Sequence, residues 1–389
     1  MTEWKEYKLG ELTIDGKGSY GIAAPAIDFD SDKHTYLRIT DINDDGTLNK
    51  DGLKSVDDKN SHKYLLRQND IVFARTGASV GRSYFYDERD GELVYAGFLI
   101  KYSIDPIKVN PKILKFYTHS QAYYDWIQTV DNGATRGNIN AQTYASMPII
   151  LPERQEQDKI VSILSSLDDK IDLLHRENAT LEQMAETLFR QWFVVEAKEE
   201  WEEGKLGDWV VIKRGGSPRP INDYISSSGY RWLKISDVTN LNSPYIFQTK
   251  EYIKESGLQK TVYLSKGSLV LSNSATPGIP KILCVDSCIH DGWLYFPKSI
   301  FSKFYLYLLF KYIREDLVNL GNGSIFTNLK TDILKDFKVV KPDTKTLENF
   351  DHQVYPIFDK LYSNDIQIQT LIQMRDGLLP RLMGGEVKI

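Results

Sequence analysis

The sequence has only two cysteines, Cys284 and Cys288, and no apolar run that approaches a membrane helix. Two thiols cannot form the disulfide framework of a small secreted domain. A bilayer-spanning helix needs about 20 consecutive apolar residues. The first residues, MTEWKEYKLGEL, lack the basic and then apolar order of a signal peptide. These absences predict a folded cytoplasmic protein that does not contact a membrane.

The sequence also lacks the motifs of common nucleotide-dependent and methyl-transferring enzymes. It has no GxxxxGK[ST] phosphate loop, and no two prolines are adjacent, so the Asn/Asp-Pro-Pro-aromatic motif of amino-methyltransferases is absent. GKGSYG at 16–21 has the form GxGxxG, but the following IAAPAID predicts no helix whose N-terminus could bind a pyrophosphate. We therefore expect no cofactor and no catalytic residue in this chain.

A metal site is the remaining chemical possibility that the residue types suggest. Cys284, Cys288 and His290 form CxxxCxH, but a structural zinc site needs four ligands, and no fourth ligand stands at a usual spacing. The segment CVDSCIH is typical of a strand, and the six histidines have no HExxH spacing. We predict buried thiols and no metal.

The formal net charge is -5, which argues against a protein that coats nucleic acid indiscriminately. Non-specific affinity for nucleic acid comes mainly from Lys and Arg that neutralise phosphates. A sequence-specific binder can still concentrate its cations on one face, so their distribution along the chain decides the question.

The second half of the sequence repeats the first half. WKEYKLGEL at 4–12 returns as WEEGKLGDW at 201–209. LRQNDIVFARTGASVGR at 66–82 returns as LSKGSLVLSNSATPGIP at 264–280, which in both copies predicts a turn, an apolar strand and a loop rich in Gly, Ser and Thr. The repeated unit is too long for a solenoid repeat and has the size of a domain with an appendage.

The pattern predicts four segments. Two strand-rich domains with aromatic clusters are expected at 1–152 and 197–342, and two polar helical segments at 153–196 and 343–389. The fold class is therefore α+β. We expect two strand-rich domains that are related by pseudo-two-fold symmetry and separated by a long antiparallel two-helix coiled coil.

The helical segments carry a coiled-coil seam, in which core positions alternate in steps of four and three. The seam residues of the first helix are Leu164, Leu167, Ile171, Leu174, Asn178 and Leu181, and those of the second are Leu361, Asn364, Ile368 and Leu371. The chain connectivity is satisfied if the two helices pair antiparallel.

Antiparallel packing places an a position against a d position and predicts that Asn178 meets Asn364. A buried amide pair would fix the register, because a slip of one heptad places an amide against hydrocarbon. The alternative is that one or both amides lie at a solvated edge. Pro356 predicts a kink or the start of a new helix, and Gly377 and Pro380 predict an end between them.

These parts together resemble a known family. Two strand-rich domains, each followed by a helix, one with LEQMAETLFRQWFV at 181–194 and the other with LIQMRDGLLPRLMGGEVKI at 371–389, resemble the specificity subunit of Type I restriction-modification systems. The segment 16–46, with GKGSYGIAAPAID and YLRITDINDDG, resembles one of its target recognition domains. The resemblance covers essentially the whole chain.

The resemblance implies a subunit without catalytic activity. Each target recognition domain would read one half of a split site on double-stranded DNA, and the helices would act as a spacer that docks two modification (methyltransferase) subunits. Restriction subunits would join to form the nuclease. GATRGNIN at 133–140 differs from GSIFTNLK at 323–330, so the two half-sites are expected to differ. Half-sites read from one face lie about 34–36 Å apart, a scale that a helical pair of this length can span.

Candidate DNA contacts are side chains that can donate and accept hydrogen bonds, on loops whose glycines permit close approach. In the first domain these are Arg75, Thr76, Ser79, Arg82, Thr135, Arg136 and Asn138. In the second domain they are Lys213, Arg214, Arg219, Asn273, Ser274, Thr276, Ser324, Thr327 and Asn328.

Each candidate has a structural alternative. Any of these residues could lie in an ordinary solvated loop, and Arg75 could pair with a local carboxylate such as Asp70. Tyr20 and Tyr230 near the loops could contact sugar or bases, but tyrosine is abundant in this sequence, and packing is the simpler expectation.

The first helix ends with more apolar residues than its seam uses, namely Phe189, Trp192 and Phe193. Such a surplus predicts a surface for a partner protein. It argues against one rival function, a stand-alone DNA-binding regulator with the same duplicated architecture. A second rival is a coiled-coil scaffold whose two domains do not bind DNA.

Overall fold

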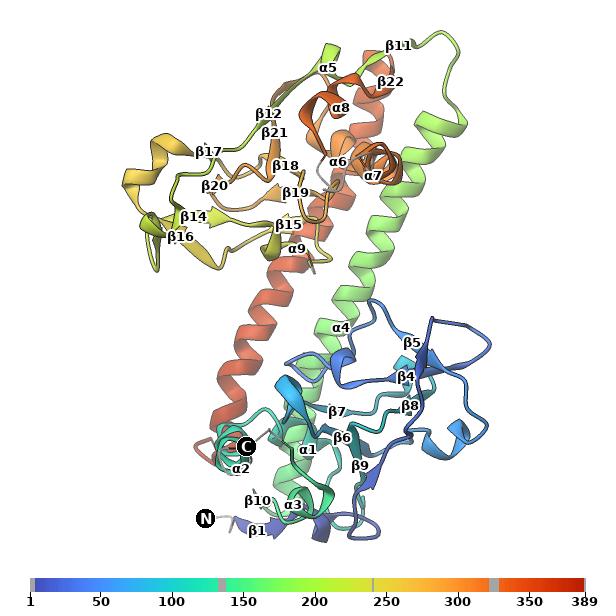
Figure 1. The fold of residues 1–389 in the computed structure, drawn as a ribbon, viewed down its shortest axis with the longest axis vertical. Coiled ribbons are helices and arrows are strands. Elements are labelled where there is room, and N and C mark those ends of the chain that lie inside the picture. The colour runs from blue at the N-terminus through green and yellow to red at the C-terminus, as the bar shows by residue number, and fades with distance from the viewer. Residues whose placement is uncertain (1–3, 132–137, 240, 322–328, 388–389) are drawn as a thin grey trace. The chain divides into compact units, whose positions relative to one another are not determined.

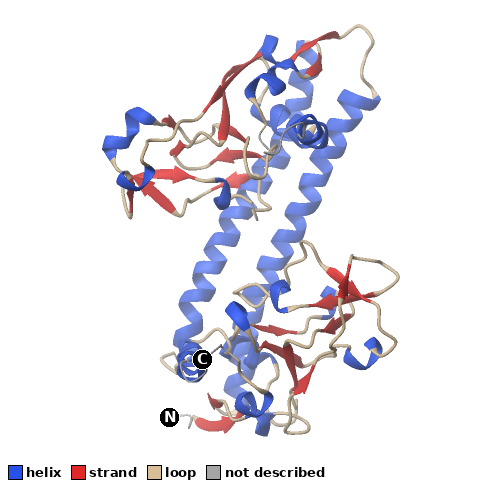
Figure 2. Cartoon of the chain, viewed as in Figure 1, coloured by secondary structure: helices blue, strands red, loops and turns tan. Residues whose placement is uncertain are grey.

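The structure is a computed structural model that describes residues 4–131, 138–239, 241–321 and 329–387. The chain divides into two compact units (Figure 1). Unit 1 contains residues 1–171 and 371–389, and unit 2 contains residues 172–370. Each unit therefore combines a strand-rich domain with one part of each of two long helices (Figure 2).

The strand-rich domain of unit 1 contains two sheets and a separate strand pair. Its strands are β1 (Lys5–Lys8), β2 (Ser19–Tyr20), β3 (Ala26–Ile27), β4 (His34–Leu37), β5 (Lys54–Val56), β6 (Asp70–Ala74), β7 (Ser83–Phe85), β8 (Leu93–Tyr95), β9 (Leu99–Ser103) and β10 (Pro148–Leu151). The sheets have the orders β2-β9-β6-β7 and β3-β5-β4-β8. The short helices are α1 (Lys112–Tyr117), α2 (Gln121–Asp131) and α3 (Ala141–Ala145). The central strand β6, DIVFA, is buried throughout, as expected for β-branched and aromatic residues in the middle of a sheet.

The strand-rich domain of unit 2 repeats this organisation. Its strands are β11 (Glu202–Lys205), β12 (Val210–Arg214), β13 (Ile225–Ser226), β14 (Tyr230–Leu233), β15 (Tyr245–Ile246), β16 (Glu251–Ile253), β17 (Val262–Leu264), β18 (Leu269–Ser272), β19 (Pro280–Leu283), β20 (Ser287–Ile289), β21 (Trp293–Ser299) and β22 (Lys338–Lys341). The sheets have the orders β12-β21-β18-β19-β15 and β13-β16-β14-β20-β17. The short helices are α5 (Leu206–Trp209), α6 (Lys303–Tyr312), α7 (Arg314–Gly321) and α8 (Thr331–Asp336). Mixed helix and strand content confirms the α+β class.

Each strand-rich domain is closed by a pairing of its first and last strands. In unit 1, β1 pairs antiparallel with β10, with Lys5 opposite Leu151. In unit 2, β11 pairs with β22, with Glu202 opposite Lys341. The chain therefore enters and leaves each domain at the same point, and a long helix begins directly after the closing strand.

The core of unit 1 contains stacked aromatic rings between the central sheet and the short helices. The rings of Phe73 and Tyr144 stack with centroids 4.8 Å apart, and both side chains are fully buried. Leu164 and Leu382 from the two long helices belong to the same core. Because burial of large apolar side chains is the main source of stability, this shared core attaches the domain to the helices.

The long helices are α4 (Arg154–Arg190), which continues through a wider turn at Gln191–Val195, and α9 (Thr344–Met383). The helix α9 runs uninterrupted through Pro356 and ends at Met383, so the predicted new helix start and the predicted end before Pro380 were wrong. Both prolines are exposed, so the carbonyl groups that lose their helical donors can bond to water. No helix in the described ranges has the length and apolar character needed to cross a membrane.

Antiparallel pairing of α4 and α9 is visible within each unit. In unit 1, Arg375 Nη1 donates to Asp168 Oδ1 at 3.3 Å. In unit 2, Asn364 Nδ2 donates to Asn178 Oδ1 at 2.9 Å, which is the amide pair that the heptad register predicted. Asn364 is fully buried and Asn178 is half-buried. Of the other predicted seam residues, Leu164, Ile171, Leu174, Leu361 and Ile368 are buried, and Leu167, Leu181 and Leu371 are partly buried.

The amide pair belongs to a larger polar network that also involves the second domain. Asn178 Nδ2 donates to Asp365 Oδ1 at 2.9 Å, and the Ser243 hydroxyl donates to the other oxygen of Asp365. The buried Lys281 ammonium donates to the carbonyl groups of Leu241 and Ser243. Buried polar groups cost free energy unless they are hydrogen-bonded, so this network stabilises one register and one seating of the domain.

A second group of contacts joins the same domain to α4. Glu182 accepts hydrogen bonds from the Tyr307 hydroxyl and the Lys311 ammonium, each at 2.6 Å. Lys311 also forms an ion pair with Glu186. Tyr307 and Lys311 lie on α6, so the helix that covers the sheet is bound directly to the long helix.

We predict that Asn178→Ala lowers the free energy of unfolding of the chain by about 1–3 kcal/mol, because Asn364 and Asp365 each lose a hydrogen-bond partner in a buried environment. Urea denaturation followed by circular dichroism measures the change. Gln183→Ala on the exposed face of the same helix is the matched control and should change the midpoint little. Equal losses in the two variants would contradict the role of the amide pair.

The contribution of Lys281 to the free energy of unfolding changes with pH. The change has the opposite sign to that expected for a surface lysine in an ion pair. The pKa of Lys281 is lowered from 10.5 to about 8, mainly by burial and also by the nearby Lys311 and Arg314, against the opposing effects of Glu182 and Asp365. Between these two values the unfolded chain binds more protons than the folded chain, so the contribution of Lys281 to stability rises with pH in this window.

We therefore predict that the wild-type chain gains stability relative to Lys281→Met between pH 7.5 and pH 9.5, by on the order of 1–2 kcal/mol. Urea denaturation of both proteins across this range measures the difference. Lys298→Met, at an exposed position on β21, is the control. Its free energy of unfolding should change with pH as that of the wild type does. A constant offset between the wild type and Lys281→Met would show that Lys281 titrates normally.

Candidate nucleic-acid interface

In unit 1, two of the loops that were predicted to contact DNA lie side by side. The first follows β6, where the Arg75 N–H donates to the Phe98 carbonyl at 3.1 Å. The second precedes α3, where the Ile139 N–H donates to the Arg75 carbonyl at 2.9 Å. Thr76 and Asn138 form an antiparallel β-bridge. The backbone at Arg75 is thus fixed on both sides, and Arg75, Thr76 and Asn138 belong to one cluster.

The Arg75 side chain lies against Tyr20. Its guanidinium carbon is 4.9 Å from the centroid of the Tyr20 ring, a cation–π distance. The Tyr20 hydroxyl accepts a hydrogen bond from the Ala141 N–H at 3.1 Å, and 42% of the residue is exposed. Tyr20 therefore has the structural role that the sequence led us to expect. It also positions the Arg75 guanidinium.

The alternative that Arg75 pairs with Asp70 is wrong. Asp70 accepts from the Ser103 hydroxyl at 2.6 Å and lies 3.3 Å from the Lys101 ammonium. Within the part of the chain that the structure describes, Arg75 has no carboxylate partner, and its buried Nε has no hydrogen-bond acceptor.

Ser79 and Arg82 lie further along the same loop. Ser79 belongs to a single helical turn, and its carbonyl accepts the Arg82 N–H at 3.0 Å. Arg82 forms an ion pair with Asp44 at 2.6 Å and donates to the Ile42 carbonyl at 3.1 Å. The charge of Arg82 is therefore already compensated within the domain.

In unit 2, Asn273 occupies the position after the central strand. Its N–H donates to the Gly292 carbonyl at 2.8 Å, and its carbonyl accepts the Leu329 N–H at 2.7 Å. Only 4% of Asn273 is exposed, and its side-chain amide donates to the Asp291 carbonyl at 3.3 Å. This residue is held inside the domain, whereas Ser274 and Thr276 on the following turn are partly exposed.

The basic run at the end of β12 surrounds Asp291. Arg219 donates to the Asp291 carboxylate at 3.5 Å, Arg214 lies 3.9 Å from the same oxygen, and the Ser217 hydroxyl donates to the other oxygen at 2.6 Å. Burial raises the pKa of this carboxyl group, but the hydroxyl and the two guanidinium groups outweigh burial and lower it. Asp291 is therefore a carboxylate at neutral pH that orients two exposed arginines, while Lys213 beside them is exposed.

The sequence alone did not identify Asp291 as part of this cluster. A signal was present, because AGFL at 96–99 in the first copy corresponds to DGWL at 291–294 in the second, and the acid appears in one copy only. Phe98, which is 59% exposed beside Arg75, was also missed. An isolated exposed phenylalanine has no sequence pattern that marks it.

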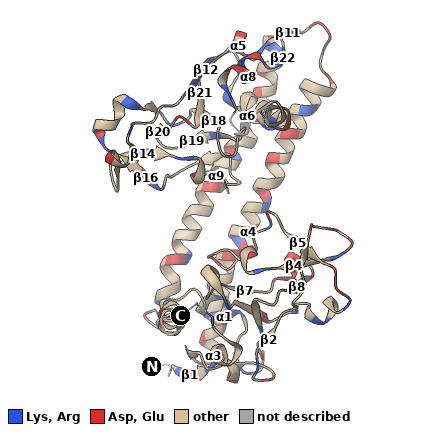
Figure 3. Cartoon of the chain, in the orientation of Figure 1, with Lys and Arg blue, Asp and Glu red and all other residues tan. Residues whose placement is uncertain are grey.

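Five candidate residues lie outside the described residues, namely Thr135, Arg136, Ser324, Thr327 and Asn328. The basic and acidic residues that the structure describes are interspersed along both strand-rich domains (Figure 3). Several arginines are paired with carboxylates of their own domain, as in Arg38–Asp41 at 2.6 Å. The candidate interface therefore depends on particular cations and not on net charge.

The prediction that Phe189 and Phe193 form a partner surface was wrong. Phe189 is 2% exposed and Phe193 is 9% exposed, and both belong to the core of unit 2. The Phe193 ring contacts Phe350 with centroids 4.8 Å apart, and Trp192, which is partly buried, contacts the same ring at 5.9 Å. The apolar surplus at the end of α4 serves to anchor the second domain to both helices.

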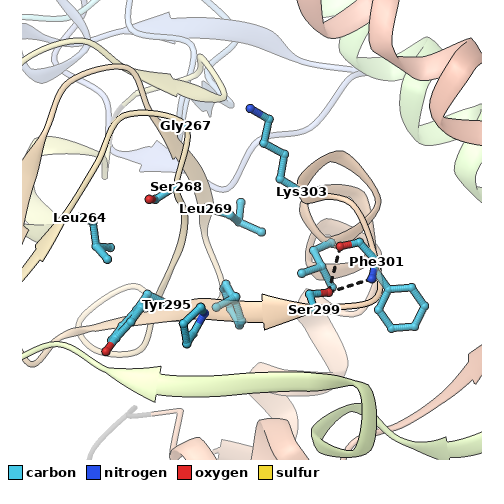
Figure 4. Close-up of a pocket in the computed structure, with 11 residues that line it drawn as sticks. Leu264, Gly267, Ser268, Leu269, Tyr295, Ser299, Phe301 and Lys303 are labelled. Carbon is cyan, nitrogen blue, oxygen red and sulfur yellow. Dashed lines mark hydrogen bonds between the residues drawn. The ribbon is translucent and has the colours of Figure 1, made fainter.

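A pocket of about 210 Å³ in unit 2 offers little chemistry. It lies between the loop 264–269, the strand β21 and the start of α6. Lys303 extends toward the turn at Gly267, and Leu264, Leu269, Tyr295 and Phe301 surround the space (Figure 4). The lining residues include no carboxylate, histidine or cysteine, and the Ser299 hydroxyl already donates to the Phe301 carbonyl.

The two thiols are not arranged as metal ligands. Burial raises the pKa of Cys284 to about 12 and that of Cys288 to about 11, so both remain protonated at neutral pH. The residues that the structure describes contain no cluster of three or more potential metal ligands.

Comparisons with known proteins agree with the duplicated architecture. The family model of the Type I restriction modification DNA specificity domain matches residues 1–183 and 198–374. The Type I restriction enzyme HindI specificity subunit of Haemophilus influenzae is 24% identical to this chain and is matched over 100% of both sequences. The Type I restriction enzyme MjaIX specificity subunit of Methanocaldococcus jannaschii is 23% identical over 68% of this chain and 66% of that protein.

A solved structure shares the fold. The crystal structure of the Type-I restriction-modification system S subunit from M. genitalium has a TM-score of 0.61 to this chain at 15% identity, over 98% of this chain and 96% of that chain. The two regions that the family model matches together cover most of the sequence. The chain therefore belongs to the family of Type I restriction modification DNA specificity domains.

Proposed function

We propose that this chain is the non-catalytic specificity subunit of a cytoplasmic Type I restriction-modification enzyme. In this function it reads a split, asymmetric site on double-stranded DNA and docks two modification subunits, which restriction subunits join. Target recognition domain 1 spans residues 1–152 and target recognition domain 2 spans residues 197–342, with the helical spacers 153–196 and 343–389 following them.

One observation carries this proposal. The same strand-end arrangement occurs once in each domain, but the guanidinium beside it comes from a different strand: from Arg75 after the central strand β6 in the first domain and from Arg214 at the end of the edge strand β12 in the second. Two scaffolds of the same kind with different polar groups are what a reader of two different half-sites requires. A coiled-coil scaffold protein would not need this divergence.

Each long helix carries an equivalent exposed methionine, which would allow the chain to bind two copies of the modification subunit. The repeated Gln-Met pair at 183–184 and 373–374 leaves Met184 51% exposed and Met374 49% exposed, and neither residue belongs to the seam. Exposed methionines are adaptable apolar contacts for a partner protein. We propose that each is part of a docking surface for one modification subunit, in place of the buried Phe189 and Phe193.

The split site is tested by purifying the full chain with its modification subunits and sequencing the methylated positions of a DNA library. We expect a motif of two specified segments separated by unspecified base pairs. Replacing the loops of domain 2 should change one segment only. A motif without a gap, or the loss of both segments together, would contradict two separate readers. Specific binding by the chain without any modification subunit would favour the stand-alone regulator.

Docking is tested by Met184→Glu and Met374→Glu. Each variant should bind one modification subunit where the wild-type chain binds two, because a charge placed in an apolar contact is costly to desolvate. Native mass spectrometry measures the stoichiometry. The exposed neighbours Gln183→Glu and Gln373→Glu introduce the same charge one residue away and should retain two copies. Two bound copies in both methionine variants would place docking elsewhere.

A further inference from the structure

A glycine marks the same point in both strand-rich domains. The Gly21 N–H donates to the Leu99 carbonyl at 3.2 Å, and the Gly215 N–H donates to the Trp293 carbonyl at 2.9 Å. A Cβ at Gly21 would overlap the carbonyl oxygen of Ala96, and a Cβ at Gly215 would overlap that of His290. Both backbones therefore cross a neighbouring strand too closely for any other residue.

The residues before these glycines are equivalent. Tyr20 ends β2 and pairs with Ile100 on β9, and Arg214 ends β12 and pairs with Leu294 on β21. The residues after the two central strands are equivalent as well, because Arg75 and Asn273 each accept one N–H from the segment before the next helix. The two equivalent positions thus carry Tyr and Arg in the first domain, and Arg and Asn in the second.

In both domains the side chains at these two positions are linked, directly in the first domain and through a shared acceptor in the second. In the first domain the Arg75 guanidinium lies 4.9 Å from the centre of the Tyr20 ring. In the second domain the Arg214 Nε and the Asn273 amide donate to the same acceptor, the Asp291 carbonyl. Each domain therefore has one guanidinium at this place, which comes from the central strand in one copy and from the edge strand in the other.

The surroundings determine what each guanidinium can do. Arg75 is restricted by an aromatic ring and, among the residues that the structure describes, has no carboxylate partner, whereas Arg82 on the same loop is compensated by Asp44. A guanidinium presents two parallel donors that match the O6 and N7 acceptors of guanine in the major groove. Restriction by a ring reduces the conformational entropy that is lost on binding.

We propose that Arg75 specifies a guanine in the half-site of the first domain, and that Arg214, oriented by Asp291, has this role in the second domain. Asn273 is then a positioning residue that holds the Asp291 backbone and does not contact a base. This inference rests on the proposed function, because it assumes that the domains read DNA. It adds which residue sets specificity and which base that residue reads.

The test uses the full chain assembled with its modification subunits. The split motif of the wild-type complex is determined first, and binding is then measured for duplexes in which each specified base pair is changed in turn. Arg75→Ala should reduce the preference for guanine at one position of one segment by roughly 5- to 150-fold and leave the other segment unchanged. Arg214→Ala should do the same at one position of the other segment.

Two further variants separate base reading from charge and from folding. Arg75→Lys keeps a cation but loses the planar paired donors that lie against the Tyr20 ring, so it should weaken the guanine preference even if Arg75→Ala does not fold. Arg89→Ala removes an equal charge from the same domain, at an arginine that pairs with Asp87 and lies outside the candidate loops, and should leave every base preference unchanged.

The outcomes distinguish the two proposals. A wild-type complex without a split motif would overturn the proposed function itself. A split motif whose base preferences survive Arg75→Lys, or a uniform loss of binding to all sequences in Arg75→Ala, would overturn the guanine-reading role and leave the proposed function standing. A first segment without any G·C pair would also overturn it.

Discussion

The buried amide pair of Asn178 and Asn364 is the contact on which the arrangement of unit 2 depends. Apolar seam positions tolerate a slip by one heptad, because one leucine can replace another, but a buried amide tolerates only a partner that can hydrogen-bond. Asn178 also donates to Asp365, which holds Ser243 from the second domain. The register of the helices and the seating of the domain are therefore set by one connected network.

The closing strand pairs extend this constraint to the polar strand ends. Because β1 pairs with β10 and β11 pairs with β22, each domain leaves directly into a long helix from a fixed point. The central strands β6 and β18 then end at positions whose backbone is hydrogen-bonded on both sides. The backbone that carries a side chain at such a position is held as rigidly as the sheet. Specific recognition needs side chains on a rigid support.

Sequence reasoning succeeded where a pattern repeats along the chain. The duplication, the α+β class and the Asn178–Asn364 pair follow from periodicity and from internal similarity, which are local and countable. The two phenylalanines near the end of α4 were misinterpreted because a surplus of apolar residues on a helix fits a partner surface and a domain core equally well. Which of the two it serves depends on α6 and on Phe350, far along the sequence.

The helix end and the residues around Asp291 could not be predicted for a different reason. A proline inside a helix is tolerated when the carbonyl that it leaves without a donor faces water, and exposure is a property of the folded chain. The contacts of Asp291 with Arg214 and Arg219 join residues more than 70 positions apart, through strand pairing that has no local signal.

The comparison of the two domains shows how duplication separates structure from specificity. The glycines at 21 and 215 are retained at the same point because no side chain fits there, so the backbone of the site is fixed by sterics. The positions beside them face no such limit, and there Tyr and Arg in one copy correspond to Arg and Asn in the other. The arginine follows the central strand in one copy and ends the edge strand in the other, so it keeps its place in the domain but differs in its direction of approach and its supporting partner. Two copies of one backbone can thus present different hydrogen-bonding faces without any change in the core that holds them.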